Sequence, residues 1–532
     1  MILGICSHQR PGAVLGRHVA LLLATTLVLS SAVPATAQPQ TGHSLARSYF
    51  ANAQKALAAG DLATAVEKLN QAIQADPHYA EAYLLLGLAE FQRGETTKSI
   101  EHYQRALQLQ PNSYSGHYNL ALAYLRDHRL QEGRAQLERA VKLGPSQPDA
   151  VYDLGVVLLA QGHPAQALSY LTRARKLNPR RPDVAFNIVR AELEAGRVSE
   201  ARTDAHIAAA RLGSDPRWSA AIGQLFLKNG QPKDAAVYLL GAGAVSPENV
   251  EIRNQLALAY LQSGQSTQVL KLLAEPKTAD DHYLRGSAYY LDHRFEEADL
   301  ESDAALTLAP DNPRILGLRT RLLQRAGQQD EAIEVAQKAA SLAPDWDEPY
   351  YLAGVSLYFV GRFPEADKNL SRAVELNPNT PRALFMQAVT LVSLGKSSQA
   401  EQSLRRAIAL QPENARFHCH LGLLLARQNQ DAKAEESFRK AIELAPHYAL
   451  SHYELGKLLA QSNRLPAAAE ELSQAVRYEP NLSAAYYQLS RVYVRLGEAE
   501  KSQAVLAEFE RLHQREVSDS QALDDDTRKA TE

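Results

Sequence analysis

A fixed period of 34 residues is the feature that most constrains what this chain can fold into. Prolines stand at Pro378, Pro412, Pro446 and Pro480, each 34 residues after the last. Self-similarity at this spacing predicts an array of stacked units, in which each unit contacts mainly its neighbours, rather than a set of globular domains. The architecture should therefore follow from one small unit repeated along the chain.

Each unit has the apolar spacing of two helices joined by a short break. Leu421, Leu424 and Leu425 recur at helical spacing, and Phe438, Ala441 and Ile442 do so again after the break. The fifteenth position of every unit is glycine, asparagine or histidine, residue types that tolerate a positive φ and so can end the first helix. The pattern predicts an all-α fold of tandem helix-turn-helix repeats.

Extending the period in both directions defines the domain organisation. Units are predicted to begin at Ala46, Ala80, Tyr114, Pro148, Pro182, Pro216, Val250, Ala279, Pro313, Asp347, Pro381, Ala415, Ala449 and Ser483. The unit at residues 250–278 has only 29 residues, so its second helix must be short. It separates a first arm of six repeats (46–249) from a second arm of seven (279–516). Two interpretations stay open for it: a tolerated deletion, or a hinge between the arms.

The two ends of the chain differ from the repeats. An apolar run with basic residues before it and Ala35-Thr36-Ala37 after it predicts a signal peptide at residues 1–37, cleaved after Ala37. The protein is then periplasmic or secreted, and no membrane span remains after cleavage. The alternatives are an uncleaved anchor, or translation that starts near Val14. Residues 38–45 are expected to be a short leader segment, and the polar, acidic residues 517–532 a disordered tail.

The repeat resembles the tetratricopeptide repeat family over about residues 46–516. The residues that stand in the family's slots are Tyr83, Leu86, Gly87, Ala434, Phe438, Ala441 and Pro446, and the family's usual tryptophan is replaced by Tyr49, His117, Tyr350 or His418, among others. The resemblance implies a right-handed α-α superhelix, an α-solenoid. It also implies that the first helices line a concave groove, where partners usually dock.

Projecting the family's concave positions onto this sequence gives a set of aromatic and basic residues. The candidate groove residues are Tyr283, Arg321, Arg325, Tyr351, Phe385, Arg427, Tyr453, Lys457, Tyr487, Arg491 and Arg495. Acidic residues at the second position of the units end with Glu348, so the C-terminal groove should be the more positive half. Such a stripe favours an acidic ligand. The alternatives are that the rings pad the joints between units and that the charges form an ordinary solvated face.

Composition and motifs limit the kinds of ligand and reaction that the sequence supports. The net charge is −3, from 57 basic and 60 acidic residues, which is not the basic excess of a nucleic-acid binder. No nucleophile elbow, zinc-protease motif or phosphate loop is present, so we expect no enzyme and no cofactor. His418-Cys419-His420 is the most metal-like cluster, but neighbours two apart diverge on a helix, which favours a structural role. The lysine and asparagine of a carboxylate clamp are missing.

The leading hypothesis is therefore a non-enzymatic, exported scaffold that holds a protein or peptide, possibly acidic, in its concave groove. The alternative is a component of a cell-envelope or polysaccharide synthesis and export complex, in which the aromatic rows would bind glycan.

Overall fold

The structure is a computed structural model that describes residues 40–179, 181–212, 215–246 and 248–531. The predicted signal peptide at residues 1–37 and its cleavage site lie outside the described residues. The chain divides into two compact units, residues 1–272 and 273–532, and each is described by itself. Within the described residues there is no strand, and no helix combines the length and the apolar character needed to cross a membrane.

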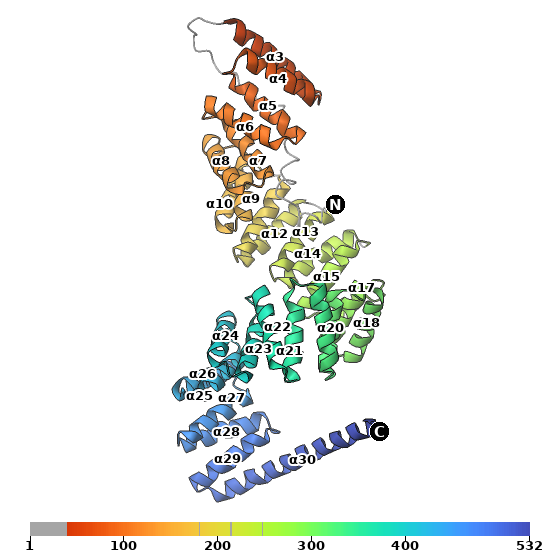
Figure 1. The fold of residues 1–532 in the computed structure, drawn as a ribbon, viewed down its shortest axis with the longest axis vertical. Coiled ribbons are helices and arrows are strands. Elements are labelled where there is room, and N and C mark those ends of the chain that lie inside the picture. The colour runs from red at the N-terminus through yellow and green to blue at the C-terminus, as the bar shows by residue number, and fades with distance from the viewer. Residues whose placement is uncertain (1–39, 180, 213–214, 247, 532) are drawn as a thin grey trace. The chain divides into compact units, whose positions relative to one another are not determined.

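Unit 1 consists of consecutive helix pairs (Figure 1). Its helices are α3 (Gln40–Ala58), α4 (Leu62–Ala75), α5 (Ala80–Arg93), α6 (Thr96–Leu109), α7 (Tyr114–Arg126), α8 (Leu130–Leu143), α9 (Pro148–Ala160), α10 (Pro164–Leu177), α11 (Pro182–Glu194), α12 (Val198–Leu212), α13 (Pro216–Lys228), α14 (Pro232–Val245), α15 (Val250–Gln262) and α16 (Ser266–Leu272).

Unit 2 continues the same arrangement. Its helices are α17 (Ala279–Leu291), α18 (Phe295–Leu308), α19 (Pro313–Arg325), α20 (Gln329–Leu342), α21 (Asp347–Phe359), α22 (Phe363–Leu376), α23 (Pro381–Ser393), α24 (Ser397–Leu410), α25 (Ala415–Arg427), α26 (Asp431–Leu444), α27 (Ala449–Gln461), α28 (Leu465–Tyr478), α29 (Ser483–Leu496) and α30 (Ala499–Thr531). Every unit predicted to begin between Ala80 and Ser483 begins at the first residue of a helix, which confirms the tandem helix-turn-helix solenoid.

The break inside each repeat is a single residue in the left-handed region. The fifteenth position has positive φ throughout the described repeats, both at glycines such as Gly94 (φ 83°) and at His128 (φ 60°) and Asn429 (φ 57°). Two described first helices, α13 and α19, begin with a capping side chain followed by proline. Asn312, for example, accepts a hydrogen bond of 3.0 Å from the amide of Arg314.

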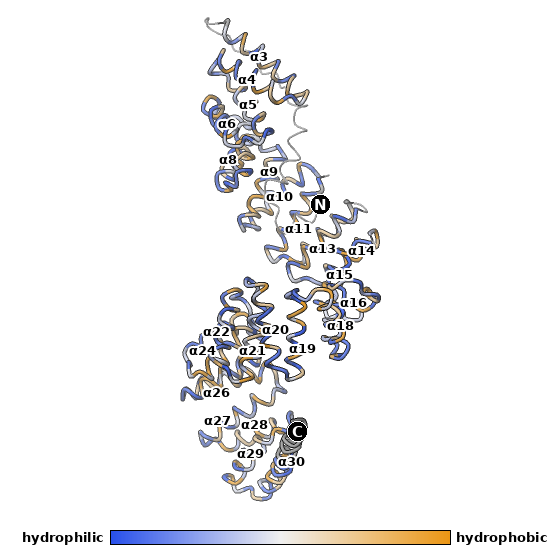
Figure 2. Tube along the Cα trace, turned by 45° about the vertical axis from the view of Figure 1, so that its right-hand side comes forward, coloured by the Kyte–Doolittle hydropathy of each residue, from blue (hydrophilic) through white to orange (hydrophobic). Residues whose placement is uncertain are grey.

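Small residues let the two helices of a repeat approach closely. A Cβ added to Gly422 would lie 2.6 Å from a ring atom of Phe438 on the partner helix. Ala434, which the second helix turns toward the first, is fully buried. Hydrophobic and hydrophilic residues alternate along the helices (Figure 2), so each helix directs one face to its partner and one to water. The buried core thus lies between the paired helices.

First helices of successive repeats contact one another within each unit. α5 meets α7 and α11 meets α13 in unit 1, whereas α19 meets α21 and α27 meets α29 in unit 2. Successive second helices in the described chain make no comparable contacts. The first helices therefore line the shorter, inner side of the repeats, as the concave positions require. We call this side the inner face.

The shortened repeat has a second helix of seven residues, α16. The boundary between the two units falls directly after it, between Leu272 and Leu273. Its shortness agrees with the sequence prediction, whereas its action as a hinge stays a prediction.

Two expectations about the ends need correction. Helix α3 begins at Gln40, so most of the predicted leader segment at residues 38–45 belongs to the first helix. At the other end, α30 continues to Thr531, so the backbone of the predicted disordered tail is helical as far as that residue (Figure 1). The physical reason is local: residues 498–532 contain no proline or glycine, and most of them are good helix formers.

Candidate functional site

Cations lie over aromatic rings along the inner face of unit 2. The guanidinium of Arg382 lies 4.6 Å from the ring centroid of Tyr351, one repeat earlier, and that of Arg416 lies 4.8 Å from the ring of Phe385. Each arginine stands at the second position of its repeat, so the same geometry recurs in register. Two successive joints of the inner face are therefore closed by an arginine stacked on a ring.

Glu348 neutralises the N-terminal end of this row. Glu348 is only 5% exposed, and its carboxylate pairs with Arg321, at 2.5 Å, and with Arg382. Burial would lower the pKa of Arg321, but the neighbouring carboxylate outweighs this and raises it. Arg321, which the sequence placed in the groove, is thus held in a salt bridge and is not free for a ligand.

The C-terminal half of the inner face keeps its positive charge. From α23 to α29 the predicted inner positions carry no acidic residue. Arg416, Arg427 and Arg491 form no ion pair with any residue that the structure describes, and all three are exposed. A surface hollow of about 500 Å³ opens beside Arg416, with Asn414 and Tyr448 in its wall.

Two other predicted cations already have partners. Lys457 lies over the ring of Tyr453, 5.4 Å from its centroid, and pairs with Glu454 at 2.7 Å. Arg495 donates to the carbonyl of Ala460 at 2.9 Å and to the side chain of Asn463 at 2.8 Å. Arg495 therefore caps the end of the first helix in the preceding repeat, and its contacts are structural.

The predicted aromatic residues separate into covered and accessible rings. Phe385 is 4% exposed and stacks on Phe417 at 5.2 Å, so for this ring the alternative interpretation, padding of the joint, describes what is seen. Tyr283, Tyr351 and Tyr453 are half-buried. Tyr487 is 42% exposed, between Phe509 of α30 at 5.3 Å and Arg491 at 5.8 Å.

Sequence reasoning missed Arg382, Arg416 and Phe359. The two arginines occupy the same position as the acidic residues that were considered, so a charge count along that row would have found them. Phe359 lies at the end of α21 with 66% of its surface exposed. It shares its position with Arg325 and Arg427, but only the structure shows that the ring is uncovered.

One group of charges on the inner side of unit 1 is paired internally. Arg181 pairs with Asp149 at 2.7 Å and with Asp183 at 3.0 Å, and it lies 4.0 Å from the ring of Tyr152. Behind it, the hydroxyl of Tyr118 donates to buried Asp153 at 2.8 Å. Burial raises the pKa of Asp153 to about 7. Arg181 therefore lies between two carboxylates.

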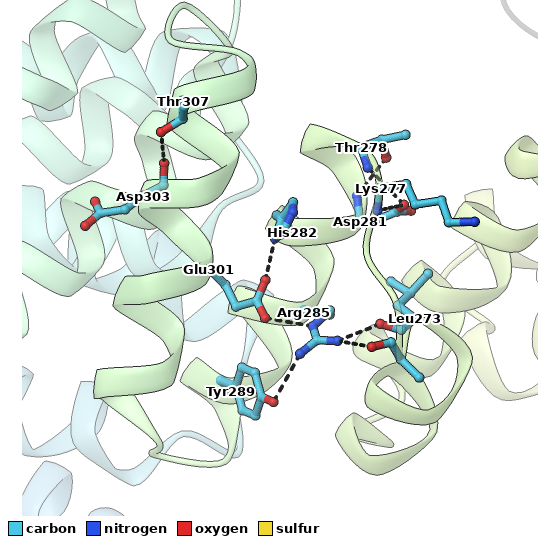
Figure 3. Close-up of polar contacts among 11 residues, drawn as sticks. Leu273, Lys277, Thr278, Asp281, His282, Arg285, Tyr289, Glu301, Asp303 and Thr307 are labelled. Atoms are coloured by element: carbon cyan, nitrogen blue, oxygen red, sulfur yellow. Dashed lines mark hydrogen bonds and ion pairs between the residues drawn. The ribbon is translucent and has the colours of Figure 1, made fainter.

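The first helix of unit 2 is braced to the chain that precedes it (Figure 3). Arg285 donates to the carbonyls of Leu273 and Ala274, each at 2.8 Å, and to Glu301 at 2.8 Å, while His282 lies 2.6 Å from the other oxygen of Glu301. Arg285 stands where most repeats have an apolar residue. It supplies the irregular segment with the hydrogen bonds that a longer helix would have made.

The His418-Cys419-His420 cluster has structural contacts. His418 is hydrogen-bonded to the carbonyl of Pro412 at 2.9 Å, and His420 packs edge-on against Phe385 at 4.8 Å. Cys419 is fully buried, and burial raises the pKa of its thiol to about 11. The three side chains thus point to different neighbours.

Comparison with known families identifies the repeat. One tetratricopeptide repeat model matches residues 50–114, 118–163, 351–395, 385–449 and 453–515, and a second matches residues 158–225. The chain therefore belongs to the tetratricopeptide repeat family. Such a scaffold fold implies a role in protein–protein interaction.

Solved structures resemble this chain at low sequence identity. The crystal structure of the APC/C hetero-tetramer Cut9–Hcn1 is similar at 14% identity and a TM-score of 0.46, covering 84% of this chain and 96% of that one. The crystal structure of the MamA protein is similar at 24% identity and a TM-score of 0.30, covering 31% and 91%. No curated protein sequence matches the chain.

Proposed function

We propose that this protein is an exported, non-enzymatic scaffold that holds an acidic segment of a partner protein on the inner face of unit 2. The segment lies across α25, α27 and α29, where Arg416, Arg427 and Arg491 receive its carboxylates. The leader pattern at residues 1–37 supports export, which places the scaffold in the periplasm or outside the cell.

One observation carries the choice of ligand: three exposed arginines share the inner face and form no ion pair with the described residues. Arginine presents several N–H donors in a plane that matches a carboxylate. Arg181 and Arg321, by contrast, are already paired with acids. An acidic partner supplies the missing counter-charges.

The same geometry argues against glycan binding on the aromatic row. Sugars stack on open ring faces, but Tyr351 and Phe385 lie under guanidinium groups, and Phe385 is buried. A ligand that approaches this wall meets arginine N–H groups before it meets a ring. Carboxylates fit that surface better than a sugar face does.

Peptide binding tests the proposal directly. Full-length protein without residues 1–37 is titrated into fluorescein-labelled decaglutamate, and anisotropy is followed at 50 and 300 mM salt. We expect binding that weakens with salt and is lost in the triple variant Arg416→Glu, Arg427→Glu, Arg491→Glu. A matched triple variant on second helices, Arg405→Glu, Arg406→Glu, Arg439→Glu, controls for net charge. Equal loss in both variants, or no binding by the wild type, would refute the proposal.

Export needs its own test. Residues 1–60 are fused to alkaline phosphatase, which becomes active only outside the cytoplasm, and the mature N-terminus is sequenced. We expect an active fusion whose chain begins at Gln38. An inactive fusion with an intact leader would show that the scaffold works inside the cell, and the peptide-binding result would stand by itself.

A further inference from the structure

Four exposed residues form a row on one edge of the inner face of unit 2. Arg325, Phe359, Ser393 and Arg427 occupy the same position near the ends of α19, α21, α23 and α25, and all four are exposed. Arg325 therefore lies one repeat before the ring of Phe359, and Arg427 lies two repeats after it. Ser393, between Phe359 and Arg427, is small. We call this set the edge row.

Phe359 differs from the other inner-face rings because nothing covers it. Its neighbours Tyr358 and Val360 turn into the core around Leu357 and Ala366, whereas Phe359 does not join that cluster. Among the described residues its one ring contact is with Tyr358, at 5.7 Å between centroids and 79° between planes. A phenyl ring that is 66% exposed offers apolar area that a partner's side chain can remove from water.

The charges of the edge row indicate what that partner is. Arg325 lies over the ring of Phe295 at 4.8 Å, and neither it nor Arg427 forms an ion pair with a described residue. An apolar partner surface would leave both guanidinium groups without counter-charges, and a basic one would be repelled. A segment that combines carboxylates with one large apolar side chain satisfies all three positions.

Helix spacing sets the distances in that segment. Packed helices lie about 8–10 Å apart, and an extended peptide rises about 3.3 Å per residue. One repeat therefore corresponds to about three peptide residues, and two repeats to about six.

We infer that unit 2 recognises an extended acidic segment in which a large apolar residue sits on Phe359, with one carboxylate about three residues away at Arg325 and another about six residues away on the other side at Arg427. This inference rests on the proposed function and extends its site from Arg427 on α25, which both share, to Phe359 on α21 and Arg325 on α19; it adds the sequence pattern of the partner. The pattern is asymmetric, so comparing a peptide with its reversed sequence measures the chain direction.

Four labelled peptides of equal charge test the pattern by anisotropy: Glu-Ser-Ser-Leu-Ser-Ser-Ser-Ser-Ser-Glu, its reversed sequence, the same peptide with leucine moved next to the last glutamate, and the same peptide with serine in place of leucine. We expect one of the first two to bind about tenfold more tightly than the last two, since a buried leucine is worth that much.

A double-mutant cycle assigns the leucine contact. Phe359→Ala should weaken the tight peptide about tenfold and leave the serine peptide unchanged, whereas Leu300→Ala, an equally exposed apolar residue on a second helix, should change neither. Two outcomes would overturn the inference and leave acidic-peptide binding intact. One is that the effects of Phe359→Ala and of the peptide's leucine-to-serine change on affinity are additive. The other is that peptides of all spacings bind with equal affinity. Failure of every peptide and of decaglutamate to bind refutes the proposed function, and the inference with it.

Discussion

Replacing Asp153 with asparagine should stabilise the protein at alkaline pH. Asp153 is 5% exposed, its carboxyl accepts a hydrogen bond from Tyr118, and burial raises its pKa to about 7. Near neutrality the folded protein therefore holds a proton on a group that ionises freely in the unfolded chain. An asparagine amide keeps the acceptor for Tyr118 and replaces the acid's O–H donor with an N–H.

The magnitude follows from the two pKa values. An unfolded aspartate has a pKa of about 3.9, so the folded value is about three units higher, and at 1.36 kcal/mol per unit the ceiling is about 4 kcal/mol. Because the folded pKa is the higher one, the folded state binds more protons between pH 4 and 7. The contribution of Asp153 to wild-type stability is therefore greatest below about pH 4 and falls as pH rises to about 7.

Urea unfolding of the full chain at pH 4.5, 6, 7 and 8 measures the effect. We expect Asp153→Asn to exceed the wild type by about 1–4 kcal/mol at pH 8 and by progressively less as pH falls. Asp149→Asn, which removes an ion pair with Arg181, is the control and should not stabilise. A difference that is constant across this pH range, or a variant less stable than wild type at pH 8, would refute the reasoning.

Three further predictions concern packing, ionisation and the start of unit 2. Gly422→Ala should destabilise by about 1–3 kcal/mol in urea because its Cβ would meet Phe438, whereas Gly241→Ala, with nothing within 4 Å, should stabilise by up to about 1 kcal/mol. Burial opposes the charged form of His452, but hydrogen bonds to Glu471 and to the Pro446 carbonyl outweigh burial and raise the pKa of His452. The stability that the charged form contributes is present below pH 6.5 and is lost as pH rises past the folded pKa. His452→Gln should therefore remove this pH dependence from the free energy of unfolding. Arg285→Leu should speed amide exchange over residues 273–278 about tenfold, because it removes two hydrogen bonds; unchanged exchange would contradict the brace.

The repeat boundaries could be predicted because they depend on local chemistry. A residue that tolerates positive φ ends each first helix, and a proline follows most of the second helices. These signals act over a few residues and need no distant partner. The prediction of a disordered tail at residues 517–532 was wrong for a local reason. The polarity of these residues was given more weight than their lack of helix breakers, and α30 continues to Thr531.

The candidate site was predictable as a row of positions, but not as a set of available groups. The same sequence rule selected Arg321, which Glu348 neutralises, and Arg427, which forms no ion pair with the described residues. Position in the repeat fixes which face a side chain occupies. Its partners come from neighbouring repeats, in which the corresponding residues differ.

The sequence alone determined the helix pairs, their order and the face that each position occupies, because backbone preferences and apolar periodicity act within a single repeat. Only the tertiary structure decided which inner-face charges already form ion pairs and which aromatic rings are covered. Arg382 lies over Tyr351 and pairs with Glu348, whereas the ring of Phe359 is exposed to solvent. Those outcomes depend on distances between side chains of adjacent repeats, and the spacing of residues along the chain does not encode them.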